Sequence, residues 1–336
     1  MLTLANPKIV GEGEHRSGWP YVIDCCQSLL CDDAPVLFDD FAERSFLYSK
    51  KWNEGAIYHQ PWITVIHHPP DMPQWYMPEM HLQELLKKPR FVESLPHLKL
   101  IISLGEPLTS WLQENLPEVP VVTLRHPTGR PLMYWTPQRW RKNQYKMMIQ
   151  VGWFLRNVSS IYQCPPIPKR LSKAHLKNSS PWIDFAARLC RNAMSRMRSD
   201  LPHDDRSVTQ IPKQNDAWYD VLLSENIVFV ELLSAVANNT VVECIARNTP
   251  IVVNRHPGPM SYLGPDYPLY YDDLREVPDL LTEDRIMAAH YHLARLDKWW
   301  IRGPLFAEHL RNACVQHVPE LAGYDWPETT PLQCDL

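Results

Sequence analysis

Short apolar runs separated by polar turns recur along the chain and predict alternating strands and helices. Runs that are rich in β-branched and aromatic residues, without polar alternation, are typical of strands buried on both faces of a parallel sheet. In the first half of the chain, such strands are predicted over residues 8–10, 34–38, 62–66, 98–103 and 119–124. Helices are predicted between them over residues 19–30 and 107–115.

The clearest unit lies in the second half. Residues 226–231 and 249–253 predict two buried strands, and apolar positions at helical spacing between them predict a helix. Such a strand, helix and strand cross over right-handedly, so the helix start and the carboxyl ends of both strands face one crevice. The polar residues that can cap the helix start are Asn238, Asn239 and Thr240.

The rest of the second half is less regular. Residues 146–151 predict its first strand, whereas residues 165–212 show helical spacing only near 182–197. Residues 255–264 contain several glycines and prolines and predict a loop. Further helices are predicted over residues 218–224, 282–300 and 305–315.

These patterns predict an α/β protein made of two domains. A stretch rich in proline, tryptophan and arginine, residues 129–143, lacks periodicity and serves as the connection. The last two predicted helices lie close enough to the C-terminus to pack back across the first domain. We therefore predict an N-terminal domain over residues 1–142, a second domain over 143–281, and C-terminal helices with a tail over 282–336.

Composition narrows the class of protein. The 336 residues are 45% hydrophobic and 21% charged, which is typical of a globular chain and atypical of a disordered one. The 34 basic and 38 acidic residues give a net charge of -4, so nucleic acid is an unlikely partner. The N-terminus lacks a signal-peptide pattern, no apolar stretch has the length of a membrane span, and the eight cysteines form no C-x-x-C pair. We expect a cytoplasmic protein.

The helix start in the second half has the chemistry of a phosphate site. Asn239 and Thr240, together with the unpaired amides of the first helical turn, can hold a diphosphate. Glu243 follows one turn later, where a carboxylate can accept hydrogen bonds from two ribose hydroxyls. The alternative is that Asn238 and its neighbours only cap the helix.

Residues after the first strand of the second half also suit a phosphate. Gly152 lets the backbone approach a ligand closely, and Arg156 can donate forked hydrogen bonds to phosphate oxygens. The alternative for Arg156 is an ordinary surface arginine.

Polar residues follow the predicted strands of the first half and predict an acceptor side. His67 and His68 end one strand before a proline turn, and either imidazole can take a proton from a hydroxyl nucleophile. A metal pair is less favoured, since adjacent strand residues point to opposite faces. Glu106 and His126 follow the next two strands. A glycine-rich loop ends at Gly18-Trp19, but Arg16 occupies the place of the third glycine of a G-x-G-x-x-G motif.

The segments NIVFVELLSAVA and NNTVVECIARNTPIVVN resemble the donor-binding domain of GT-B glycosyltransferases. KMMIQVGWFLRN resembles the opening of that domain, and HRSGWPYV with PWITVIHHPP resembles the acceptor half. The resemblance implies two Rossmann-like domains facing a central cleft, with a helix start holding the diphosphate and a downstream glutamate holding the ribose. It implies transfer of a hexose from a nucleotide diphosphate sugar to a glycan or another hydroxyl acceptor.

The resemblance also bears on the mechanism. Many retaining members carry a second glutamate seven residues before the ribose glutamate, where Val236 stands here, so the stereochemical class stays open. No Asp-x-Asp motif occurs in the chain, so we expect no metal and no other cofactor. Arg156, Lys213 and the helix start would then stabilise the leaving diphosphate.

Three other functions remain open from the sequence. A nucleotide-sugar epimerase or hydrolase of the same fold would consume the donor without an acceptor, because function does not follow from fold. A non-catalytic sugar- or nucleotide-binding module would bind the donor without turnover. Glycosylation of a modified base in nucleic acid is a further acceptor possibility, which the acidic balance disfavours.

Overall fold

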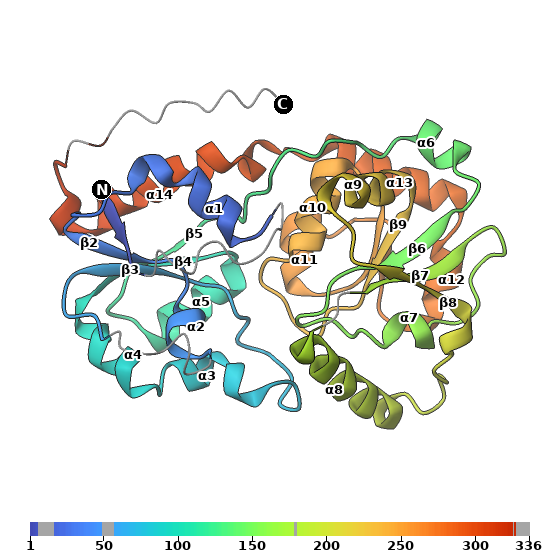
Figure 1. The fold of residues 1–336 in the computed structure, drawn as a ribbon, viewed down its shortest axis with the longest axis horizontal. Coiled ribbons are helices and arrows are strands. Elements are labelled where there is room, and N and C mark those ends of the chain that lie inside the picture. Colours follow the sequence, from blue (N-terminus) through green and yellow to red (C-terminus); the bar gives the residue numbers. More distant parts are fainter. Residues whose placement is uncertain (6–16, 49–56, 178–179, 325, 327–336) are drawn as a thin grey trace. The chain divides into compact units, whose positions relative to one another are not determined.

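The computed structural model describes residues 1–5, 17–48, 57–177, 180–324 and 326. They divide into two compact units, drawn in Figure 1. The first unit contains residues 1–71, 78–130 and 298–336, and the second contains residues 72–77 and 131–297. The units thus divide at residues 130 and 131, before the boundary at 142 and 143 that the composition indicates.

The first unit is built on a parallel sheet. Its strands lie in the order β1-β2-β3-β4-β5, which is also their order in the sequence. Because all of them run in one direction, their carboxyl ends meet at one edge. These strands are β1 (Leu2–Leu4), β2 (Val36–Asp39), β3 (Trp62–Ile66), β4 (Leu98–Ser103) and β5 (Val121–Thr123).

Helices cover both faces of this sheet. Figure 1 draws α1 and α14 on one side of the strands and the other helices of the unit on the opposite side. A Cβ placed on Gly303, at the start of α14, would lie 1.9 Å from the Cys25 sulfur of α1, so only glycine allows this close packing. The helices are α1 (Trp19–Cys25), α2 (Ala42–Phe46), α3 (Leu82–Leu85), α4 (Pro89–Ser94), α5 (Glu106–Asn115) and α14 (Gly303–His317).

The second unit has a doubly wound sheet with the strand order β11-β10-β9-β6-β7-β8. The chain moves outward from β6 through β7 to β8, returns to β9 beside β6, and then moves outward on the other side. The order therefore reverses between β6 and β9, and ligands of such sheets bind beyond the carboxyl ends at that point. The strands are β6 (Met147–Gln150), β7 (Ser172–Lys177), β8 (Val208–Pro212), β9 (Ile227–Val230), β10 (Ile251–Asn254) and β11 (Tyr270–Tyr271).

Helices also flank this second sheet. Two of them, α9 and α10, lie side by side and share a buried ion pair between Arg247 and Asp220. The helices of the unit are α6 (Pro137–Lys142), α7 (Ser160–Gln163), α8 (Pro181–Met197), α9 (Asp216–Glu225), α10 (Asn239–Arg247), α11 (Pro257–Leu263), α12 (Val277–Leu280) and α13 (Glu283–Arg295).

The predicted elements compare well with the observed ones where apolar runs are long. β3 and β4 have the predicted bounds, and α10 lies between β9 and β10 as expected. The strand predicted over residues 8–10 lies outside the described residues. Of the two last helices, α14 belongs to the first unit, as expected, whereas α13 belongs to the second.

Two parts of the second unit differ from the prediction. The weakly patterned stretch 165–212 contains two strands, β7 and β8, besides the predicted helix. The segment predicted as a loop contains α11, whose first-turn prolines lack only amides that a helix start leaves unpaired. No helix among the described residues is long and apolar enough to cross a membrane.

Candidate functional site

The reversal point of the second sheet is lined by two loops that bond to each other. One follows β6 and the other follows β9. The amide of Asn157 donates to the Glu231 carbonyl at 2.8 Å, and the amide of Leu233 donates to the Leu155 carbonyl at 2.9 Å. The Tyr76 hydroxyl accepts a hydrogen bond from the Leu155 amide at 3.1 Å. The first loop is therefore fixed relative to the start of α10.

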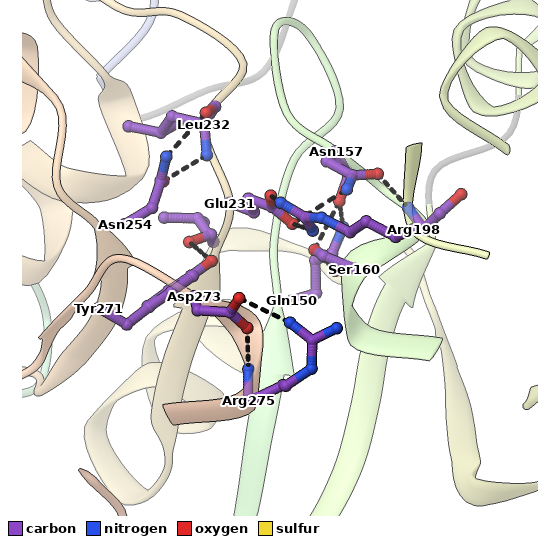
Figure 2. Close-up of polar contacts among 12 residues, drawn as sticks. Gln150, Asn157, Ser160, Arg198, Glu231, Leu232, Asn254, Tyr271, Asp273 and Arg275 are labelled. Carbon is purple, nitrogen blue, oxygen red and sulfur yellow. Dashed lines mark hydrogen bonds and ion pairs between the residues drawn. The ribbon is translucent and has the colours of Figure 1, made fainter. Parts of the chain in front are cut away.

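A buried polar network beneath these loops holds them in place (Figure 2). The Glu231 carboxylate accepts hydrogen bonds from Asn157 Nδ2 at 2.9 Å and from both terminal nitrogens of Arg198. Asn254 pairs with the backbone of Leu232, accepting from its amide at 2.7 Å and donating to its carbonyl at 3.0 Å. These hydrogen bonds tie the loop after β6 to the loop after β9, and that loop to β10.

Arg156 extends from the first loop to the start of α10. Its Nη2 donates to Asn238 Oδ1 at 3.1 Å and to Thr240 Oγ1 at 3.0 Å, and its Nη1 donates to the Phe154 carbonyl at 3.0 Å. The side chain is buried, and its Nε has no hydrogen-bond partner among the described residues. The predicted donor residues Arg156, Asn238 and Thr240 therefore form one group, which we call the α10 cradle.

The charge of the α10 cradle is unusual for a helix start. The amides at the N-terminus of a helix carry partial positive charge, which favours anions and disfavours a guanidinium. Burial lowers the pKa of Arg156, and Tyr219 and Glu243 oppose that shift. A buried guanidinium beside the positive end of a helix, with an unsatisfied donor, fits a bound anion.

Gly152 makes room for the Arg156 guanidinium. Its φ of +78° lies in the left-handed region that side chains rarely adopt. A Cβ at this position would lie 2.6 Å from Arg156 Cζ and 2.8 Å from its Nε. The positive φ therefore favours glycine, and a Cβ at this position would force the Arg156 guanidinium to move.

A small pocket lies beside Gly152. Its lining includes Trp153, His175 and Lys177, which come from the loop after β6 and from β7. The Tyr162 hydroxyl lies 2.8 Å from His175 Nδ1, and burial lowers the pKa of His175 to about 4. The pocket thus adjoins the α10 cradle through Gly152 and presents a neutral imidazole.

Glu243 lies on α10 but is completely buried. Its Oε2 accepts a hydrogen bond from the Tyr219 hydroxyl of α9 at 2.7 Å, and the neighbouring Arg247 guanidinium pairs with Asp220. A ribose hydroxyl that bonds Oε2 would therefore compete with the Tyr219 phenol. The ribose role of Glu243 stays a prediction.

Two other predicted donor residues lie apart from the Arg156 side chain. Asn239 is half-buried in the first turn of α10 and forms no polar contact with described residues. Lys213 is exposed just after β8, at the outer end of the sheet order, and has no partner in the described part of the chain. Only long-range attraction links Lys213, as placed here, to an anion at α10.

In the first unit, aromatic rings gather around Trp19. Its ring stacks on Phe41 at 5.5 Å between centroids and lies 5.8 Å from the rings of both His67 and His126. Phe41 also meets His67 edge-on at 5.0 Å. The structure thus brings together three residues that the sequence placed on the acceptor side, Trp19, His67 and His126.

His67 and His68 have different surroundings. His68 is fully buried, with Nδ1 2.8 Å from the Met80 carbonyl and Nε2 3.1 Å from the Tyr48 hydroxyl. Burial lowers its pKa to about 4, so the ring is neutral near pH 7. His67 is partly open, with 24% of its side chain exposed. Only His67 is therefore placed to meet a substrate.

Glu43 is a candidate site residue that the sequence did not reveal. The carboxylate is buried on α2, and its Oε1 accepts hydrogen bonds from the amides of His67 at 2.8 Å and His68 at 2.7 Å. Its Oε2 lies 3.2 Å from His67 Nδ1. No local motif marks an acidic residue in the segment DDFAER, because the contact depends on how α2 packs against the end of β3.

Two other acceptor-side predictions lie outside this cluster of rings. Gly18 is the N-cap residue of α1 and places Trp19 at the helix start. Glu106 is exposed in the first turn of α5 and has no partner among the described residues. The described chain contains no group of three or more His, Cys, Asp and Glu side chains arranged to hold a metal ion.

No protein-family model and no curated protein sequence matches this chain. Solved structures do. Sucrose-phosphate synthase from Thermosynechococcus elongatus matches with a TM-score of 0.55 and 12% identity, over 84% of this chain and 73% of that one. The E. coli trehalose-6-phosphate protein bound with UDP-2-fluoro glucose matches with a TM-score of 0.56 and 10% identity, over 89% and 77%. These are GT-B proteins with two Rossmann-like domains. The chain has the GT-B fold.

The GT-B fold was predicted from the donor segment, and the comparison confirms it. A third GT-B structure, UDP-forming α,α-trehalose-phosphate synthase from Burkholderia xenovorans in complex with glucose-6-phosphate, matches with a TM-score of 0.52 and 12% identity, over 87% of this chain and 77% of that one. Within this GT-B fold, the candidate residues form the α10 cradle in the second unit and the Trp19 cluster of rings in the first.

Proposed function

We propose that this protein is a glycosyltransferase that moves a hexose from a nucleotide diphosphate sugar to a hydroxyl acceptor. The observation that carries the proposal is the α10 cradle, where buried Arg156 bonds Asn238 and Thr240 at the point where the strand order reverses. A guanidinium and a helix start together bind a diphosphate through charge-assisted hydrogen bonds. Gly152 leaves room for the Arg156 guanidinium itself, and a small pocket adjoins the cradle.

The structural neighbours support a uridine nucleotide as the donor to test first. One neighbour is bound with UDP-2-fluoro glucose, and another is described as UDP-forming and is in complex with glucose-6-phosphate. At this level of identity they share the fold with this chain, and their ligands are a guide to the assay. UDP-glucose and a hexose phosphate are therefore the first pair of substrates.

The proposed reaction needs stabilisation of the charge on the leaving diphosphate and removal of the proton of the acceptor hydroxyl. The bond between the anomeric carbon and the diphosphate breaks while the acceptor oxygen bonds to that carbon. Arg156 and the α10 amides stabilise the negative charge on the leaving diphosphate, and His67 accepts the proton of the acceptor hydroxyl. The cradle provides positive charge of its own, so we propose that no metal is required.

A thermal-shift screen and a product assay test the proposal. We expect one class of nucleoside diphosphate to raise the melting temperature equally with magnesium and with EDTA. We then expect release of the nucleoside diphosphate to depend on an added hydroxyl acceptor. Release without acceptor would favour a hydrolase, and conversion of the donor into another nucleotide sugar without release would favour an epimerase. Binding that leaves the donor unchanged would favour a binding module, and no shift would overturn the donor site.

A conservative variant tests the cradle itself. Arg156→Lys keeps the charge but has one nitrogen in place of the three of the guanidinium, so the bonds of Nη2 to Asn238 and Thr240 and the donor at Nε cannot all be replaced. Nucleotide affinity should therefore fall about 10- to 100-fold. Arg141→Lys is the matched control, because Arg141 is exposed on α6 and pairs with Glu283. Equal affinity of both variants would contradict the assignment of Arg156.

A further inference from the structure

Glu43 and His67 face each other through polar atoms. The two carboxylate oxygens of Glu43 have different partners. Oε1 accepts both backbone amides, whereas Oε2 and His67 Nδ1 lie 3.2 Å apart, and neither of these two atoms forms a hydrogen bond with the described residues. The amides fix the carboxylate, and the carboxylate in turn faces one nitrogen of the partly open ring.

Apart from His67, the charged and titratable groups next to Glu43 have partners of their own or lie further away. On α2, the neighbouring Arg44 pairs with Asp40. On the other elements, His68 is bonded to Tyr48 and the Met80 carbonyl, and His81 is buried beyond it. Burial alone would raise the pKa of Glu43. The neighbouring His67 and His68 lower it by more than burial raises it, and the resulting pKa is about 2. Glu43 is therefore an anion at neutral pH.

We propose that Glu43 is a positioning residue that holds the His67 ring in one tautomer, with the proton on Nδ1 and a free lone pair on Nε2. The inference rests on the proposed function and assigns the acceptor proton to Nε2 of His67. When Nε2 takes that proton, the ring becomes a cation that Glu43 stabilises across the Nδ1 contact. The proton thus moves from the acceptor hydroxyl to His67, and Glu43 itself stays ionised.

Replacement of Glu43 by glutamine separates this role from a structural one. The two backbone amides require an acceptor, so the glutamine oxygen takes the place of Oε1. The glutamine NH₂ group then faces His67 Nδ1 and can only donate. The ring must accept at Nδ1 and carry its proton on Nε2, where it cannot act as a base.

The first experiment reads the tautomer in the free protein by ¹⁵N NMR of the histidine side chains. The His67→Gln spectrum identifies the signals of His67. At a pH where the ring is neutral, we expect the proton on Nδ1 in the unmodified protein and on Nε2 in Glu43→Gln. Glu84→Gln is the matched control, because Glu84 lies on the same unit and forms an exposed pair with Lys87. If the unmodified protein and the Glu43→Gln variant have the same His67 tautomer, the inference is overturned.

The second experiment measures kcat at a saturating concentration of the donor. We expect Glu43→Gln to lower kcat by roughly 10³- to 10⁴-fold, as loss of the orienting carboxylate does in a serine protease, with KM for the donor unchanged. If the tautomer changes in Glu43→Gln but the unmodified protein has no transferase activity, the proposed function is refuted and the pairing of Glu43 with His67 stands. A tautomer change with normal kcat would refute the positioning role. Melting temperatures identify any variant that fails to fold.

Discussion

The guanidinium of Arg156 occupies the space that a side chain on Gly152 would fill. A Cβ at Gly152 would lie 2.6 Å from Arg156 Cζ. We predict that Gly152→Ala displaces the guanidinium from Asn238 and Thr240 and lowers affinity for the nucleoside diphosphate about 10- to 100-fold, which isothermal titration calorimetry measures.

Gly264 provides the matched control. Its φ of +82° imposes a similar backbone strain on alanine, but no atom lies within 4 Å of its Cβ position. Gly264→Ala should therefore lose some stability and keep its nucleotide affinity. Equal losses of affinity in the two variants would show that strain, rather than displacement of Arg156, is responsible.

Much of the fold could be predicted because the buried strands are continuous apolar runs. β3 and β4 were located to the residue, and the cap of α10 was predicted from Asn238, which accepts from the Val241 amide at 3.3 Å. β7 and β8 were missed because SKAHLK and VTQIP contain charged or polar residues, as suits strands near the edge of a sheet.

The candidate donor residues were more predictable than the candidate acceptor residues. Arg156 and the α10 start follow strands β6 and β9, so the sequence order itself brings them to one edge. Glu43 meets His67 through the contact of α2 with the end of β3, which no spacing in the sequence encodes. The burial of Glu243 was likewise missed, since it depends on Tyr219 of a different helix.

Glu243 and Tyr219 offer a test of ribose binding. We predict that Glu243→Gln lowers affinity for a nucleoside diphosphate about 10-fold, because a carboxylate accepts both ribose hydroxyls and an amide does not. Tyr219→Phe should change affinity less than about threefold, since a ribose hydroxyl would take over the place of the phenol. It should cost about 1–3 kcal/mol of stability, because the carboxylate loses a buried donor.

A nucleotide without the ribose hydroxyls completes this test. With a 2′,3′-dideoxynucleoside diphosphate, Glu243→Gln and the unmodified protein should bind equally well. A loss of affinity that persists with the dideoxy nucleotide would assign Glu243 to the packing of α9 against α10 and refute the ribose role.

The two adjacent histidines should respond differently to substitution. We predict that His67→Gln lowers kcat at least about 100-fold, because it removes the proton acceptor. His68→Asn should change kcat less than about tenfold and lower stability, because His68 bonds the Met80 carbonyl and Tyr48 within the core. Steady-state kinetics with saturating donor decide this, and the reverse order would assign the base to His68.

The pairing of His67 with Glu43 also predicts the stereochemistry. A residue that deprotonates the acceptor allows direct attack on the anomeric carbon from the face opposite the diphosphate, which inverts its configuration. One structural neighbour, trehalose-6-phosphate synthase, is described as transferring with retention, but at 12% identity that likeness concerns the fold. The anomeric coupling constant of the product in ¹H NMR measures the outcome, and a retained configuration would exclude His67 as the base for a single displacement.

The buried histidines predict how stability depends on pH. His68 and His175 have pKa values lowered from 6.5 to about 4 in the folded protein. Between these values the unfolded chain binds a proton that the folded chain does not, so stability falls as the pH drops from 6.5 towards 4. Each histidine contributes up to about 3 kcal/mol to this loss.

Asp39 has the opposite effect on the stability of the folded protein within the same pH range. Burial raises its pKa from 3.8 to about 6, so the folded state binds the extra proton and gains stability as the pH falls from 6 to 4. Two histidines outweigh this one carboxyl group, and the net loss on acidification remains. His68→Asn should reduce the difference in unfolding free energy between pH 7 and pH 4.5 by about 2–3 kcal/mol, measured by urea denaturation. An unchanged difference would show that His68 takes up its proton in the folded state as readily as in the unfolded chain.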